Sequence, residues 1–139
     1  MVEELLDHQH YLLEQLLALL AREYQCLSKR ELDSIISIAK QKMQLLKQLT
    51  ENDELIAEHP QKQAIKQKKK LIHKQARLES LLQKCHHANE INGRIIEASS
   101  EEVERLAHEM NQLLRQQSMT YDKAGRQNTA VHHGKSFKV

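Results

Sequence analysis

Histidine is the residue type that first suggests chemistry in this chain, because nine histidines occur among 139 residues. A di-iron site in a helical bundle needs Glu-x-x-His pairs on facing helices, and no histidine here has a glutamate three residues before it. Asp7 with His10 is the nearest approach to such a pair. Cys85, His86 and His87 are successive residues, so on a helix they point in different directions and do not share one ion. We therefore expect solvent-facing histidines and no metal site.

The remaining reactive residue types also lack the spacing of a site. Cys26 and Cys85 lie far apart in the sequence and match no metal-binding or redox motif, which predicts two reduced thiols. The chain has no glycine-rich phosphate loop, nucleophile elbow or paired carboxylates. We expect no catalytic residue, no cofactor and no enzymatic activity.

A basic run lies between Lys66 and Arg77, and such a run could contact RNA or acidic lipid. Aromatic residues for base stacking and a nucleic-acid-binding motif are missing there, and the formal net charge of the chain is only +2. We expect a solvated helix face and no nucleic-acid partner. Five glutamates between Glu97 and Glu109 give a later segment the opposite sign, which could orient a partner.

The composition predicts an all-α protein. Glycine and proline together account for only four residues, aromatic residues for 3% and charged residues for 29%, and the abundant types (Leu, Gln, Lys, Glu, Ala) are good helix formers. Long antiparallel helices or a coiled coil fit this mixture. No apolar run approaches ~18 residues, so we expect no stable membrane insertion. The acidic beginning lacks the features of a secretory signal, which favours a cytoplasmic protein.

The first helix is predicted over residues 2–27, and its apolar face is wide enough for two partner helices. One stripe carries Leu6, Leu13, Leu17, Leu20, Tyr24 and Leu27, and it is widened by Leu5, Leu12, Leu16 and Leu19.

Ser28 and Glu31 have the spacing of a capping box, with Leu27 and Leu32 as its hydrophobic staple, and they predict the start of a second helix. The apolar stripe of that helix is expected to carry Leu32, Ile36, Ala39, Met43, Leu46 and Leu49. Pro60 predicts its end at residues 58–60.

The third helical pattern runs from residue 61 to 118. Its stripe steps by four and three without losing phase through Leu78, Leu82, Cys85, Asn89, Asn92, Ile96, Ser99, Val103, Leu106, Met110 and Leu113. The constant phase favours one continuous helix, whereas the Asn92-Gly93 dipeptide and a possible capping box at Ser99 favour a break. Asn89 and Asn92 either fix the helix register or face water beyond the bundle.

A continuous third helix of ~56 residues would be about twice as long as the first two, which reach ~39 Å each. Residues 1–118 would then form a helical bundle whose late apolar stripe faces water, and such a stripe usually marks a binding site. We expect the partner-binding residues to be Ile96, Val103, Leu106, Met110, Leu113, Leu114 and Tyr121. Two alternatives remain: a break near Gly93 or Ser99 that closes a four-helix bundle, and a homodimer. Residues 119–139 have no periodicity and are expected to form a flexible tail.

Two short motifs resemble those of a known family. The segment from Lys84 to Ile96 is similar to the Cys-x-x-x-Asn-x-x-Asn-Gly-x-x-Ile stretch of FlgN-type flagellar export chaperones. The segment from Thr120 to Arg126 resembles the Thr-Tyr-Asp-x-x-Gly-Arg signature near their C-termini. The leucine-rich opening and residues 42–49 are also similar, so the resemblance spans nearly the whole chain.

The resemblance implies a cytosolic chaperone for the hook–filament junction proteins FlgK and FlgL. Members of that family keep these proteins unassembled and deliver them to the flagellar type III export gate. It also implies that a helical segment of the client binds the C-terminal region, where the late apolar stripe lies. The alternative function is that of a self-associating structural coiled-coil protein.

Overall fold

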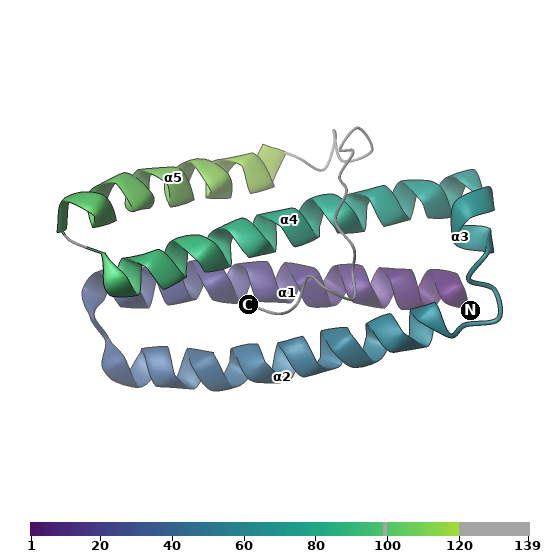
Figure 1. The fold of residues 1–139 in the computed structure, drawn as a ribbon, viewed down its shortest axis with the longest axis horizontal. Helices are drawn as coiled ribbons and strands as arrows, with labels where there is room; N and C mark the ends of the chain where they lie inside the picture. The colour runs from purple at the N-terminus through teal and green to yellow at the C-terminus, as the bar shows by residue number, and fades with distance from the viewer. Residues whose placement is uncertain (99, 120–139) are drawn as a thin grey trace.

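The computed structural model describes residues 1–98 and 100–119, and this part of the chain is built from helices without a strand (Figure 1). The elements are α1 (Val2–Lys29), α2 (Leu32–Ala57), α3 (Ala64–Gln67), α4 (Lys69–Glu97) and α5 (Ser100–Met119). The all-α prediction is therefore confirmed for the described residues. The predicted count of three long helices is wrong, because residues 1–98 and 100–119 form four long helices and one short one.

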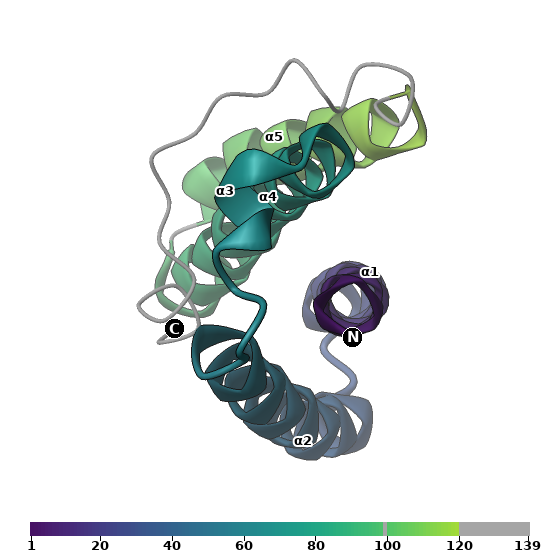
Figure 2. The ribbon, with the colours of Figure 1, turned by 90° about the vertical axis from the view of Figure 1, so that its right-hand side faces the viewer.

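α1 is the central helix of the fold. Both α2 and α4 pack along α1, α2 antiparallel and α4 parallel to it, and α5 folds back along α4 (Figure 1). In the end-on view, α2 lies below α1, while α4 and α5 lie above it (Figure 2). α5 therefore packs on the outside of α4 and does not close a four-helix ring with α2.

The leucines of α1 explain its central position. Its buried hydrophobic residues are Val2, Leu6, Leu12, Leu13, Leu16, Leu17, Leu19, Leu20 and Tyr24. Because this apolar face is wider than a single stripe, it can be covered by two helices at once. The prediction that the first helix touches two partners is confirmed.

The boundary between α1 and α2 lies where the sequence predicts it, but it is built differently. The Ser28 hydroxyl donates a hydrogen bond to the Tyr24 carbonyl at 3.0 Å, so it closes the last turn of α1 instead of capping α2. α1 continues to Lys29 and ends at Arg30, whose φ of 57° is left-handed. α2 starts after Glu31 without a side-chain cap, so the predicted capping box is wrong.

α2 buries only the last part of the predicted stripe, where Leu49 is buried and Leu46 is half-buried. Its fully buried residues are Ile38, Leu49 and Asn52, which point toward α1, whereas most of the predicted stripe faces water. α2 carries apolar residues on two sides, and α1 covers only one of them. Periodicity alone does not say which of two apolar sides finds a partner.

The third helical pattern is interrupted twice. After Pro60 the chain forms the short helix α3, and α4 begins only at Lys69, following an extended Lys68. α4 then ends at Glu97, and Ala98 is extended, with φ of −86° and ψ of 157°. The favoured continuous helix is therefore wrong. The alternative is correct in its break near Ser99 and its fold-back, but the closed four-helix bundle expected with it is not formed. Ser99 itself lies outside the described residues.

Candidate functional site

The pair formed by α4 and α5 contains most of the predicted partner-binding residues. On α5, Leu106 and Met110 are each 0% exposed and Leu113 is 7% exposed. These side chains belong to the same core cluster as the leucines of α1 and α4. The predicted exposure of these three residues is wrong, because the fold-back places α4 over them.

The other predicted residues are divided among different positions. Val103 and Leu114 are half-buried on α5. Ile96 is 68% exposed near the end of α4. Tyr121 and the predicted tail from residue 120 onward lie outside the described residues. The structure thus brings five of the seven residues onto α5 and leaves Ile96 apart from them.

The side of α4 that receives α5 follows from helix geometry. Asn89 and Asn92 face α1 and α2, because they hydrogen-bond to residues of those helices. Ala88 and Ile91 each precede one of these asparagines, so they lie about 100° further around the helix. Both are nevertheless buried. Since α5 is the other long helix that packs on α4, we infer that Ala88 and Ile91 lie under α5.

A polar cluster, buried at Glu23 and Asn92 and half-buried at Lys42 and Asn89, joins the three inner helices, α1, α2 and α4. The Lys42 ammonium on α2 donates to the Glu23 carboxylate on α1 and to the Asn89 side-chain carbonyl on α4, both at 3.0 Å. The Asn92 amide donates to the same Glu23 carboxylate and to the Leu20 carbonyl, both at 2.9 Å. The two asparagines therefore face the other helices of the bundle and not open water. Buried polar groups of this kind fix helix register.

A second buried polar contact was not predicted from the sequence. The Asn52 amide on α2 donates to the Gln9 side-chain carbonyl at 2.7 Å and to the Leu5 carbonyl at 3.0 Å. Gln9 lies three residues after Leu6 and four before Leu13, within the leucine stripe of α1. The position of Gln9 inside an apolar stripe was the signal in the sequence that could have indicated this contact, because a buried polar residue requires a hydrogen-bonding partner.

Two lysines of the basic run form ion pairs between α4 and the start of α1. Lys70 and Lys74 both contact the Glu3 carboxylate, at 2.9 and 3.2 Å, and Lys74 also pairs with Asp7. Hydrogen bonds from the two lysines lower the pKa of Glu3, and the hydrogen bond to Asp7 raises the pKa of Lys74. Lys74 is only 24% exposed, so the expectation of a solvated face is wrong for it, whereas Lys70 is 70% exposed, as that expectation requires.

The thiols and histidines show no arrangement for catalysis or metal binding in the part of the chain that the structure describes. Cys85 is buried, its Sγ lies 3.4 Å from the Leu13 carbonyl, and burial raises its pKa. His10 and His86 are half-buried, so the expectation of solvent-facing histidines is wrong for both. Burial lowers the pKa of each, which favours the neutral ring.

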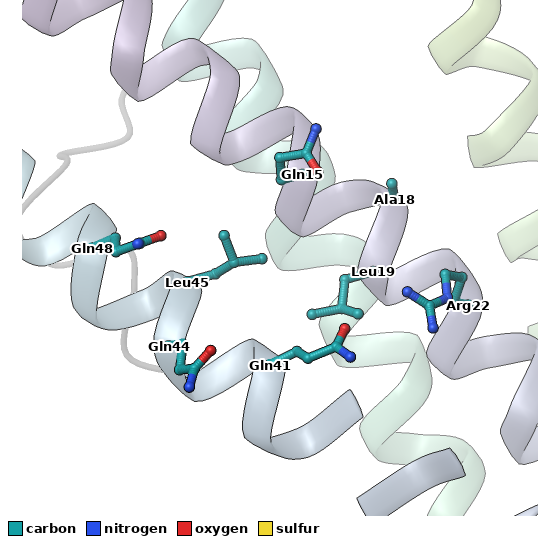
Figure 3. Close-up of a pocket in the computed structure, with 8 residues that line it drawn as sticks. All are labelled: Gln15, Ala18, Leu19, Arg22, Gln41, Gln44, Leu45 and Gln48. Atoms are coloured by element: carbon teal, nitrogen blue, oxygen red, sulfur yellow. The ribbon is translucent and has the colours of Figure 1, made fainter. Parts of the chain in front are cut away.

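A shallow pocket of about 230 Å³ lies in the groove between α1 and α2 (Figure 3). Leu19 and Leu45 lie among polar side chains there, and the complete lining is Gln15, Ala18, Leu19, Arg22, Gln41, Gln44, Leu45 and Gln48. The polar side chains of this pocket are four amides and the guanidinium of Arg22, and no carboxylate, histidine or thiol lines it. Helix surfaces are the features of this fold that can serve a protein-binding function.

Comparison with known proteins agrees with this conclusion. The family model described as FlgN protein matches residues 1–129, which include all five helices. No curated protein and no solved structure matches the chain. None of the described helices has the length and apolar character needed to cross a membrane. Because the family match takes in nearly the whole chain, the protein belongs to the FlgN family of flagellar export chaperones.

Proposed function

We propose that this protein is a cytosolic, substrate-specific export chaperone for the hook–filament junction proteins FlgK and FlgL. It binds a helical segment of each client, keeps the client unassembled and delivers it to the flagellar type III export gate. The family match supports the chaperone function. The position of α5, an amphipathic helix that packs on the outside of α4, supports the mode of binding.

Client binding on this surface requires α5 to leave α4. The proposed contact residues are Ile96, Val103, Leu106, Met110, Leu113, Leu114 and Tyr121. Three of them are buried in the closed structure and become available only when α5 moves. A client helix with an apolar stripe can replace α4 as their cover, as in other complexes where an amphipathic helix fills a groove. Ala98, which is extended between the two helices, is the pivot for this movement.

A substitution on α4 separates this mechanism from binding to the closed form. We call the form in which α5 has left α4 the open form. If only this form binds the client, the apparent Kd equals the intrinsic Kd divided by the fraction of molecules in the open form. Ile91→Ala weakens the α4–α5 contact and leaves every proposed contact residue intact. Removing a buried isoleucine costs about 2–5 kcal/mol, so we expect client affinity to rise by about tenfold or more. Weaker binding by this variant, measured by calorimetry with purified FlgK or FlgL, would contradict the opening mechanism.

A second experiment tests the contact residues themselves. Leu106→Glu combined with Met110→Glu places two charges on the apolar face of α5, which should abolish binding of both clients while the protein remains largely helical by circular dichroism. Ile72→Gln is the matched control, because Ile72 is an exposed hydrophobic residue near the far end of α4. Unchanged client binding by the double variant would exclude α5 as the binding element.

The alternative function of a self-associating coiled coil depended on an exposed apolar stripe, including Leu106, Met110 and Leu113, that a second copy of the chain would bury. In the structure Leu106, Met110 and Leu113 are covered within one chain. Sedimentation equilibrium distinguishes the two functions, since the chaperone is expected to be monomeric without its client.

A further inference from the structure

The outer side of α2 carries an uncovered apolar stripe. Leu32 is 72% exposed, Ile36 56% and Met43 71%, and Ala39 between them is also exposed. These four residues, called the outer stripe below, are separated by steps of four, three and four, so they lie along one side of the helix. Single exposed hydrophobic residues are ordinary, whereas an aligned set usually marks an interaction surface.

The outer stripe is separate from the face that holds α2 in the fold. α2 packs on α1 through a different side, which includes the buried Ile38 and Leu49. Met43 follows Ile38 by five residues, which places their side chains about 140° apart around the helix. Among the described residues, no other long helix packs along α2 as α1 does. A partner can therefore reach the outer stripe without disturbing the contact between α1 and α2.

The charges beside the stripe indicate the chemistry of its partner. Lys40 and Lys47 are exposed and seven residues apart, so they follow the same edge next to Ala39 and Met43. In the described part of the chain, neither lysine has an ion-pair partner. Asp33 precedes Lys40 by seven residues, and Glu51 and Glu54 follow Lys47 by four and seven residues, so the edge is positive between Lys40 and Lys47 and acidic at both ends. A helix that covers the stripe gains most if it places acidic residues opposite the two lysines.

A second copy of α2 or the segment beyond α5 could also cover the outer stripe, but the charges of both are unfavourable there. Antiparallel pairing of two α2 helices about Met43 brings Lys40 of one copy near Lys47 of the other, and this like-charge contact is unfavourable. The residues beyond α5, 120–139, contain four basic residues and one acidic residue, so their charge has the same sign as the edge. Both self-association and coverage by this segment therefore place positive charges together.

We propose that the outer stripe is the docking face for an acidic amphipathic helix of a partner protein. The distance from Leu32 to Met43 corresponds to about 16 Å, or three turns of the partner helix. Its apolar residues at steps of three and four pack on the stripe, and its glutamates or aspartates lie opposite Lys40 and Lys47. This face is independent of α5, so the protein has two helix-binding surfaces. The client proposed above needs the opening of α5, and the partner of α2 does not.

A pair of synthetic helical peptides tests the proposal on the full chain. One peptide has leucines at steps of three and four, flanked by glutamates, and its twin has lysine in place of each glutamate. We expect the acidic peptide to bind in a fluorescence anisotropy titration and the basic twin to bind about tenfold more weakly or less. Ile36→Gln with Met43→Gln should weaken binding of the acidic peptide by about tenfold or more. Leu55→Gln is the matched control, because Leu55 is an exposed residue of α2 outside the stripe.

Charge reversal gives the sharpest result. Lys40→Glu with Lys47→Glu should reverse the preference, so that the basic peptide binds more tightly than the acidic one. Equal binding of the acidic peptide before and after this change overturns the proposal. So does binding that survives Ile36→Gln with Met43→Gln.

Two further outcomes identify other occupants and also overturn the proposal. Loss of acidic-peptide binding in the Leu106→Glu, Met110→Glu variant would place the peptide on α5. A dimer in sedimentation equilibrium that dissociates when Met43 is replaced would identify a second copy as the cover. Peptide binding that persists in the α5 variant while client binding is lost shows that the two surfaces act separately.

Discussion

Replacing Leu106 with alanine measures how firmly α5 is held against α4. Leu106 is fully buried, and with Met110 and Leu113 it forms the buried apolar face of α5. α5 packs on α4 at the outside of the fold, whereas α1 is held between α2 and α4. We therefore expect the substitution to release α5 while the three inner helices stay folded.

The size of the effect follows from the burial. Each of the three side chains contributes about 1.5–3 kcal/mol when buried, which gives a gross docking energy of roughly 4–9 kcal/mol before the ordering of α5 is subtracted. A buried leucine-to-alanine change costs about 2–5 kcal/mol. The substitution therefore removes a large share of the docking energy, and a loss of 2 kcal/mol corresponds to about a thirtyfold larger open fraction.

Amide hydrogen exchange followed by NMR or mass spectrometry is the assay. In the Leu106→Ala protein, amides of α5 should exchange about thirtyfold faster or more, and amides in the middle of α1 should keep the rate of the unmodified protein. Leu78→Ala is the control, because Leu78 is buried on α4 in the stripe that faces α1. This control should speed exchange in all the long helices. Equal acceleration of α1 and α5 by Leu106→Ala would refute the reasoning, since α5 would then unfold only with the whole protein.

Three further predictions concern single residues. Gly93→Ala should raise the free energy of unfolding by about 1 kcal/mol in urea titration, because Gly93 lies within α4 and an added Cβ meets nothing within 4 Å; a loss of stability would show that the helix needs glycine there. Cys85 should stay unmodified by a thiol reagent at pH 8 while the half-buried Cys26 reacts, since burial raises the pKa of Cys85; labelling of Cys85 in the folded protein would contradict this. Burial lowers the pKa of His10 below 6.5, so the unfolded chain takes up this proton more readily and stability should fall as the pH drops below about 6.5. His10→Gln should flatten that pH dependence, and an unchanged profile would exclude His10 as its source.

The sequence predicted the features of the fold that depend on local pattern. The wide leucine face of α1 indicated two neighbouring helices, and α2 and α4 occupy those positions. Pro60 marked the end of α2 within a few residues, because proline cannot continue a helix. Such features depend on side-chain periodicity and backbone chemistry within one segment, and a single sequence contains that information.

The wrong predictions concern features that depend on which segments of the chain pack against each other. α2 has two apolar sides, and only packing against α1 decides that Ile38 is buried while Met43 is exposed. The stripe from Leu78 to Leu113 keeps its phase across the break, so periodicity did not detect the fold-back at Ala98. The energy that favours the fold-back comes from contact with α4, which lies outside any local window. For the same reason, Leu106 and Met110 were predicted to be exposed.

The central position of α1 has a consequence for synthesis of the chain on the ribosome. The Asn92 amide reaches the Leu20 carbonyl across 72 positions of sequence, and α4 packs along α1 beside α2. α1 and α2 can pair early, but the part of the leucine face of α1 that packs against α4 remains open until α4 has emerged. At about 5–20 residues per second, this delay lasts several seconds. During this time the nascent chaperone exposes an apolar helical surface of the kind that we propose it covers in its clients.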